Sequence, residues 1–461
     1  MRSAQAPADR QEETEEVSAG DFVPHTPEDI AAMLSAIGLA SVDDLFSGIP
    51  TELRDPAISL VDAMPEPGVV AHLKSLAARN APAGDGPNFL GGGLYDHYVP
   101  AAVRAIQSRG EFATAYTPYQ AEASQGTLQM LFEFQTMVAE LLGLAVSNAS
   151  LYDGGTALVE AVNLAAMRRE GRRVLVCGGV NPRFRRVLET YADGLGIEVE
   201  VLPLTDLGTE AATIVEAMRD EPVLAVVVQQ PNSYGFLQDA AGIAAASVDA
   251  GAVVIGVADP MTLGLVAPPG EWGAHIAIAE GTSLGNPMAF GGQCVGLFAC
   301  NDEFARYMPG RLVGETIDAE ARRGYVLTLQ AREQHIKREK AGSNICTNQT
   351  LFALGVAVHL AWLGPEGLRR VGELSSALAH RAARRIDGET NFRVASSRPF
   401  VREFAVRGPK PPREVLDELR HRGIFAGPSF DDDTFNLAFT ERRDDDDIDA
   451  LIEALTEVGK T

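Results

Sequence analysis

Residues 251–292 read GAVVIGVADPMTLGLVAPPGEWGAHIAIAEGTSLGNPMAFGG, and this stretch governs how the rest of the chain is interpreted. It holds two short apolar runs, Ala252–Ala258 and His275–Ala279, bounded by glycine and proline. Such runs are typical of buried strands in a parallel sheet. Each run ends in an acid, Asp259 or Glu280. Because α/β sheets bind ligands at the carboxyl ends of their strands, we expect these acids to border a binding site.

The position of Asp259 resembles that of the acid that holds the pyridine nitrogen of pyridoxal phosphate (PLP) in one fold family. In that family a lysine after a later strand forms a Schiff base with the cofactor. Here the second run continues into residues 280–287, EGTSLGNP, which contain no lysine. The chain has five lysines: Lys74, Lys337, Lys340, Lys410 and Lys460. The sequence therefore predicts a cofactor cradle without its covalent lysine.

Composition narrows the classes of function. The 461 residues are enough for two or three domains, and the net charge of -24 disfavours binding to nucleic acid or to a membrane surface. The four cysteines show no CxxC spacing and no metal-type cluster with histidine, which predicts reduced thiols in a cytoplasmic protein. No metal site is expected. The first 20 residues carry several acids and no apolar core, so we expect a disordered tail and not a targeting peptide.

Strand-like and helix-like segments alternate strictly from residue 173 to residue 279. This order predicts an α/β fold with a mostly parallel, doubly wound sheet. After residue 343 the pattern changes to long helices followed by short strands. We therefore expect a tail at 1–20, an N-terminal helical arm at 21–114, a large domain at 115–343 and a small C-terminal α+β domain at 344–461.

Four local patterns add detail. Thr26 is expected to cap a helix, and a glycine turn, Gly154-Gly155-Thr156, opens the helix expected at Ala157–Arg169 and offers free backbone N–H groups to an anion. An apolar helix, Gln349–Leu363, is expected to stop at Gly364-Pro365. The arginine- and lysine-rich residues up to 343 favour a solvated helix with ion pairs. The alternative is that part of this segment lines a cleft, through Arg332, Glu333, His335, Arg338 and Lys340.

Several longer motifs resemble one family, the glycine cleavage system P-proteins (decarboxylating glycine dehydrogenases). They are Tyr95–Pro100, Tyr116–Gln120, Gln125-Gly126, Phe134–Met137, Asn148–Ser150, Gly324–Ile336 and Ser343–Gln349. The resemblance covers nearly the whole chain from about residue 21. The chain length and the missing lysine resemble subunit 1, the alpha chain, of the split form of the enzyme.

This resemblance implies an aspartate-aminotransferase-like (fold type I PLP) large domain. It also implies glycine decarboxylation with PLP held covalently by subunit 2, an alpha2–beta2 assembly, and transfer of the aminomethyl group to the lipoyl arm of H-protein. The chain would complete the partner's site and would be inactive alone. Candidate shared-site residues are Tyr95, His97, Tyr116, Tyr119, Gln120, Asn344 and Asn348. A vestigial cofactor cradle would consist of Gly154, Gly155, Thr156 and Asp259.

Two alternatives stay open. The chain is an independent PLP enzyme that uses an unusual lysine, Lys337 or Lys340, or it is a non-catalytic regulatory or scaffold homologue of a PLP enzyme. Both lysines lie in a polar segment and make poor candidates for a Schiff base. Asp259 is equally open to a plain interpretation, as an acid at a strand end without a ligand.

Overall fold

The computed structural model describes residues 24–460 except 55, 58, 83–85, 220, 291 and 293. The tail expected at residues 1–20 lies outside the described residues. The chain divides into two compact units at residues 80 and 81. The second unit contains the sheet, all of the motifs that resemble the P-proteins and the acids Asp259 and Glu280.

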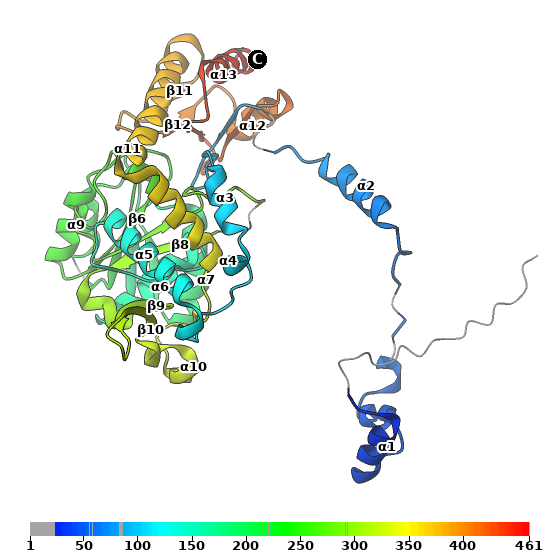
Figure 1. Ribbon diagram of the computed structural model, residues 1–461. Helices are drawn as coiled ribbons and strands as arrows, with labels where there is room; N and C mark the ends of the chain where they lie inside the picture. The colour runs from blue at the N-terminus through cyan, green and yellow to red at the C-terminus, as the bar shows by residue number, and fades with distance from the viewer. Residues whose placement is uncertain are drawn as a thin grey trace, which may run out of the picture. The chain divides into compact units, whose positions relative to one another are not determined.

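The central sheet of the described residues has seven strands in the order β2-β8-β7-β6-β5-β3-β4. It lies inside the main unit, where Figure 1 labels β6 and β8. In chain order these are β2 (Val146–Ser147), β3 (Arg173–Val176), β4 (Glu198–Val201), β5 (Ala225–Gln230), β6 (Val253–Ala258), β7 (Ile276–Glu280) and β8 (Gly296–Cys300). Strands β3 to β7 pair in parallel, whereas β8 runs antiparallel to β7 and β2. The mostly parallel α/β sheet is as the sequence predicts. Asp259 follows β6 directly, and Glu280 ends β7.

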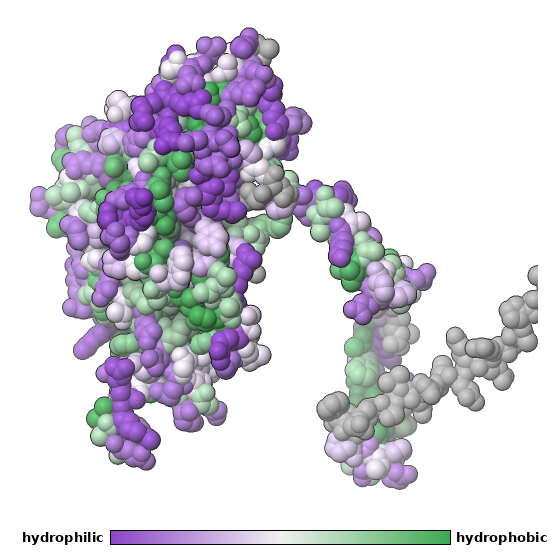
Figure 2. All heavy atoms as spheres, turned by 45° about the horizontal axis from the view of Figure 1, so that its top comes forward, coloured by the Kyte–Doolittle hydropathy of each residue, from purple (hydrophilic) through white to green (hydrophobic). Residues whose placement is uncertain are grey.

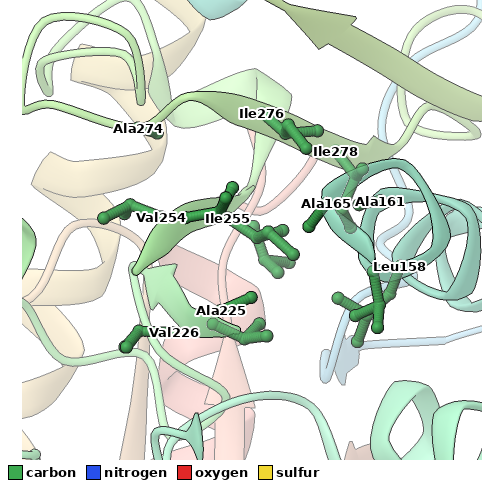
Figure 3. Packing of buried hydrophobic residues seen from close by; sticks show 14 of the residues in the cluster. Leu158, Ala161, Ala165, Ala225, Val226, Val254, Ile255, Ala274, Ile276 and Ile278 are labelled. Carbon is green, nitrogen blue, oxygen red and sulfur yellow. The ribbon is translucent and has the colours of Figure 1, made fainter. Parts of the chain in front are cut away.

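Helices cover the sheet because alternate residues of each strand point to opposite faces. Ile276 and Ile278 belong to a cluster with α6 (Gly154–Ala166), and Figure 3 shows α6 side chains packed against β5, β6 and β7. Ala277 and Ala279 belong to a second cluster with α5 (Gln125–Leu142). The remaining helices of the large body are α3 (Ala101–Gln107), α4 (Gly110–Ala113), α7 (Pro182–Leu195), α8 (Ala211–Ala217) and α9 (Ala240–Asp249).

The expected solvated helix before residue 343 is wrong. Residues 312–328 form an antiparallel hairpin, β9 (Leu312–Ile317) with β10 (Arg323–Thr328), followed by short helical turns that include α10 (Gln334–Lys337). Two glutamine side chains of α5 make hydrogen bonds to the backbone of this hairpin, as a neighbouring strand would. Gln125 bonds both the N–H and the C=O of Tyr325, and Gln135 does the same for Val313. Side-chain amides can do this because each carries a donor and an acceptor.

A long helix, α11 (Thr350–Glu389), joins the large body to a smaller cluster. It is broken at Gly364, whose backbone is not helical and which precedes Pro365, as the sequence predicts. Its first part packs with α5, and its last part packs in a third core with α12 (Pro412–His421) and α13 (Asp445–Val458). The strands here are β11 (Arg393–Val394), β12 (Glu403–Arg407) and β14 (Thr434–Ala438), and β13 (Phe425–Gly427) pairs with β1 (Asn88–Leu90). By length and composition α11 is apolar enough to cross a membrane, and 39% of its most apolar window is buried inside the protein.

The first unit holds two helices, α1 (Pro27–Ala36) and α2 (Glu66–Ala77). The expected cap is confirmed, since Thr26 and Asp29 form a reciprocal capping box at the start of α1. Neither helix contains a buried residue, and hydrophobic side chains lie on the surface of this unit (Figure 2).

Candidate functional site

Asp259 at the end of β6 is paired with an arginine of the same chain. Both Nε and Nη2 of Arg402 donate to Asp259 Oδ2, at 2.8 and 2.6 Å. Arg402 is 2% exposed, and it precedes β12, 143 residues from Asp259 in sequence. The carboxylate that would face a pyridine nitrogen therefore already has a cationic partner.

An aromatic ring lies against this arginine. The guanidinium carbon of Arg402 is 3.5 Å from the centre of the Tyr95 ring, a close cation–π contact. The Tyr95 hydroxyl donates to Glu403 Oε2 at 2.7 Å, and Glu403 Oε1 accepts from the Gly92 N–H and the Asn436 amide. Burial, together with the Glu403 charge, raises the pKa of Tyr95. The tyrosine is thus held as a neutral hydroxyl by contacts inside the chain.

His97 extends the same network. Its Nε2 lies 2.7 Å from Arg402 Nη1, and its Nδ1 lies 2.6 Å from Glu441 Oε2. Because a guanidinium only donates, Nε2 must accept, and the proton must be on Nδ1, which donates to Glu441. Burial and the nearby Arg402 charge both lower the pKa of His97, which favours this neutral form. Asp259, Arg402, His97 and Glu441 therefore form one continuous chain of hydrogen bonds.

The glycine turn that could hold a phosphate is also occupied. Gly154 and Gly155 form the first turn of α6, which starts three residues before the expected Ala157. Asp153 Oδ1 caps the Thr156 N–H at 2.9 Å, and Glu280 Oε2 accepts the Gly154 N–H at 3.0 Å. The carboxyl groups of Asp153 and Glu280 thus occupy the positions where an anion would bind, and their negative charge would repel a phosphate.

The space left between these groups is too small for PLP. The cavity bordered by Tyr95, Phe184, Asp259 and Glu280 has a volume of about 30 Å³. Cofactor-sized pockets measure roughly 300–1,000 Å³, whereas about 10–15 Å³ holds one water. A Cβ added at Gly154 would come within 2.5 Å of the Phe184 ring. The residues of this chain therefore do not fit the cofactor, and the cradle expected at Gly154, Gly155, Thr156 and Asp259 is filled by side chains of the chain itself.

The other candidate residues lie in a separate group. Tyr119 is 54% exposed and its ring meets Arg311 and His335. Asn348 accepts from Arg311 Nη1 at 3.1 Å and donates to the Ala149 carbonyl at 2.7 Å. The remaining candidates, Tyr116, Gln120 and Asn344, are exposed. The structure thus brings Tyr95, His97 and Asp259 together in one network and places Tyr119 and Asn348 beside Arg311 in another.

Sequence reasoning missed the residues that fill the cradle: Arg402, Glu403 and Glu441. All three lie beyond residue 400, and each bonds a residue more than 140 positions away along the chain. Arg402 bonds Asp259, Glu403 bonds Tyr95 and Glu441 bonds His97. Only the sequence Arg402-Glu403, two charges next to a strand-like run, offered a signal. Among the described residues no group of three or more His, Cys, Asp or Glu is arranged to hold a metal ion.

Comparisons with known proteins agree with the fold. Residues 20–455 match the family model described as glycine cleavage system P-protein. Probable glycine dehydrogenase (decarboxylating) subunit 1 of Chloroherpeton thalassium is 43% identical over 95% of this chain and 99% of that protein. The protein of the same name from Carboxydothermus hydrogenoformans is 46% identical, over 94% and 99%.

Solved structures give the same result. An inhibitor-bound glycine decarboxylase (P-protein) of the glycine cleavage system superposes with a TM-score of 0.86 at 47% identity, over 95% of this chain and all of that chain. A sphingosine-1-phosphate lyase from Burkholderia pseudomallei, at 16% identity, has a TM-score of 0.66 over 89% of this chain and 95% of its own, and it shows the fold alone.

Proposed function

Because the chain belongs to the glycine cleavage system P-protein family, we propose that it is the half of a two-subunit glycine dehydrogenase that carries no cofactor, while subunit 2 binds PLP. The chain is a glycine dehydrogenase (decarboxylating) subunit 1, as its relatives over nearly the full length are. A subunit 1 implies a partner subunit. PLP serves decarboxylation by withdrawing electrons from the reacting carbon.

The filled cradle is the observation that carries this proposal. Arg402 neutralises Asp259, and Glu280 takes the Gly154 N–H, so both ends of the cofactor position are satisfied from within. The loop after β7 lacks a lysine, and its Asn286 is held by Gln107 at 3.1 Å and by the Phe352 carbonyl at 3.3 Å. Because a chain with a filled cradle and no lysine would not hold the cofactor itself, it would contribute to activity through residues on its surface.

We propose Tyr116, Tyr119, Gln120, Asn344 and Asn348 as the residues that reach the partner's site. Tyrosine offers aromatic area with a polar tip, which interfaces favour. Tyr95 and His97 belong to the same candidate set, and their internal bonds support a positioning role. They tie the loop at residues 92–98 to Arg402, Glu403 and Glu441.

The wider assembly is proposed on the same basis: two copies of each subunit, a lipoylated H-protein as acceptor of the aminomethyl group, and a cytoplasmic location. The acidic balance of the chain, with a net charge of -24, supports a role away from nucleic acid and anionic lipid.

The test is to co-express both subunits, reduce the PLP-loaded complex with borohydride and map the labelled peptide. The label is expected on subunit 2 alone, and glycine–bicarbonate exchange is expected to need both chains. A reduced adduct on Lys337 or Lys340 would favour the independent-enzyme alternative. Full exchange by subunit 2 without this chain would favour the scaffold alternative.

A further inference from the structure

A second cavity lies in the large body, apart from the filled cradle. It measures about 510 Å³, and its lining includes Arg306, Arg332, Lys337 and Lys340. Lys337 ends α10, which lies at the end of the main unit opposite α12 and α13 (Figure 1). The sequence alternative of a cleft is therefore partly confirmed: Arg332, Glu333 and Lys340 line it, whereas the walls do not include His335 and Arg338.

The cations of this cavity are unpaired. Within the described part of the chain, the ion pairs include none made by these two arginines and two lysines. Such clustering is unexpected in a chain of net charge -24, because neighbouring acids could have neutralised them. A concave surface of one sign concentrates oppositely charged ligands.

Arg332 offers unused hydrogen-bond donors in this cavity. Its Nε and Nη2 are shielded from solvent and have no hydrogen-bond partner. Leaving a buried charged donor unpaired costs about 1–3 kcal/mol or more, so such groups are normally satisfied. Burial lowers the pKa of Arg332, and the charge of Glu333 only partly opposes this shift. The guanidinium fork is suited to bind two oxygens of one phosphate or carboxylate.

Two acids near the cavity do not cancel this charge. Glu333 lines it, its Oε2 lies 3.8 Å from Nδ1 of His335, and its charge also acts on Arg332. Glu160 is hydrogen-bonded to Ser343, and burial raises its pKa to about 7, so its carboxyl group is partly neutral at that pH. The two arginines and two lysines of the cavity therefore outnumber the acids Glu333 and Glu160.

Apolar side chains and one aromatic ring form another part of the wall. Met167, Met308 and Ile345 line the cavity together with the ring of Tyr307. The volume is within the range of small-molecule pockets, about 300–1,000 Å³. The ligand that fits has a dianionic head for the arginines and lysines and an apolar body for the methionines.

We propose that this cavity binds a small phosphate monoester with an apolar or aromatic body. The proposal does not rest on the function of the filled cradle, and no step of glycine decarboxylation needs it. Arg332 would hold the phosphate through its two unpaired donors, and Lys337 and Lys340 would add charge from the rim.

The test uses the full chain in complex with subunit 2 and titration calorimetry with phenyl phosphate, inorganic phosphate and phenol. We expect one phenyl phosphate per copy of this chain, bound more tightly than phosphate or phenol. Arg332→Met should weaken binding about tenfold or more, since it removes charged hydrogen bonds. The double variant Lys337→Met/Lys340→Met, which changes only exposed side chains, should weaken it as well.

Arg323→Met is the matched control, because Arg323 is an exposed arginine of β10 outside the cavity. Its affinity for phenyl phosphate should equal that of the wild type. No binding at millimolar phenyl phosphate by the folded complex would overturn the proposal. Equal affinity in the wild type and the lysine double variant would overturn it also, independently of how Arg332→Met folds.

Discussion

Arg402 donates two hydrogen bonds to a single oxygen of Asp259, across the contact between the small domain and the carboxyl end of β6. This pair stands where a pyridine ring would meet the acid in a PLP-binding relative of this fold. With Tyr95 stacked on it at 3.5 Å, the guanidinium takes the place of a planar cofactor between an aromatic ring and a carboxylate. In this chain the acid at the end of β6 is therefore part of a structural junction.

The first prediction concerns the stability of this junction. Arg402→Met should lower the free energy of unfolding by up to about 3–5 kcal/mol, because the partly buried Asp259 would be left without its partner. Urea denaturation of the purified chain measures it. Adding Asp259→Asn to Arg402→Met should recover part of the loss. The control Arg369→Met removes surface pairs with Glu366 and Glu373 and should cost at most about 1 kcal/mol. A small loss for Arg402→Met would contradict the role given to the junction.

The second prediction concerns pH. The folded pKa of His97 is lowered, by burial and then by Arg402, so folding favours its neutral form. A lowered folded pKa means that the contribution is complete above the unfolded pKa, about 6.5, and is lost as pH falls below it. The urea midpoint of the wild type should therefore decrease from pH 8 to pH 5.

His97→Gln provides the comparison for that slope. Glutamine can accept from Arg402 and donate to Glu441 without titrating. Burial raises the pKa of Glu441, but the hydrogen bonds from His97 and from the Tyr98 N–H, together with its other partners, lower it to about 2 in the wild type. The glutamine amide and the Tyr98 N–H would still donate to this carboxylate in the variant. The variant should lose much of the dependence between pH 8 and pH 5. An unchanged slope would assign the dependence to other groups.

The fold could largely be predicted because its elements are local patterns. Strands β3, β5, β6 and β7 consist mostly of apolar residues, β4 alternates Glu with Val, and Gly364-Pro365 interrupts α11 in the sequence itself. The hairpin β9–β10 was not predicted because glycine and charged or hydroxyl side chains interrupt its apolar residues, and because part of its bonding comes from Gln125 and Gln135 of α5. A weak sequence signal for β10 was the pair of apolar residues two positions apart, Tyr325 and Leu327. Both are buried, whereas Val326 and Thr328 beside them are partly exposed, as is typical of a strand.

The candidate site was predictable only in part. The missing lysine and the acid at Asp259 are visible in the sequence. Arg402 is not, because nothing near residue 402 indicates which acid it meets. The sequence also could not separate Tyr95, which faces inward to Glu403, from Tyr119, which is half exposed, since both lie on loops rich in glycine or proline.

The third prediction tests the glutamine contacts of α5. Gln135→Met should leave the buried N–H and C=O of Val313 without partners, at a cost of about 1–3 kcal/mol. Hydrogen exchange of the peptide covering residues 312–328 should become faster. Gln129→Met on the same helix is the control, because Gln129 bonds only the exposed Glu133. Equal exchange in both variants would show that the hairpin holds its place without Gln135.

The fourth prediction concerns Tyr119 in the assembled enzyme. Tyr119→Ala should reduce glycine–bicarbonate exchange by the complex about tenfold or more, if the ring positions groups at the shared site. The complex itself should still form by size-exclusion chromatography, because Tyr119 is half exposed and its contacts are with Arg311 and His335. Tyr191→Ala, an exposed tyrosine of α7, should leave exchange unchanged. Tyr119→Phe should keep most of the activity if the ring matters, and little if the hydroxyl does. If exchange falls only as much as the amount of complex falls, Tyr119 is an interface residue. If an intact complex of the Tyr119→Ala variant keeps full exchange, Tyr119 does not belong to the shared site.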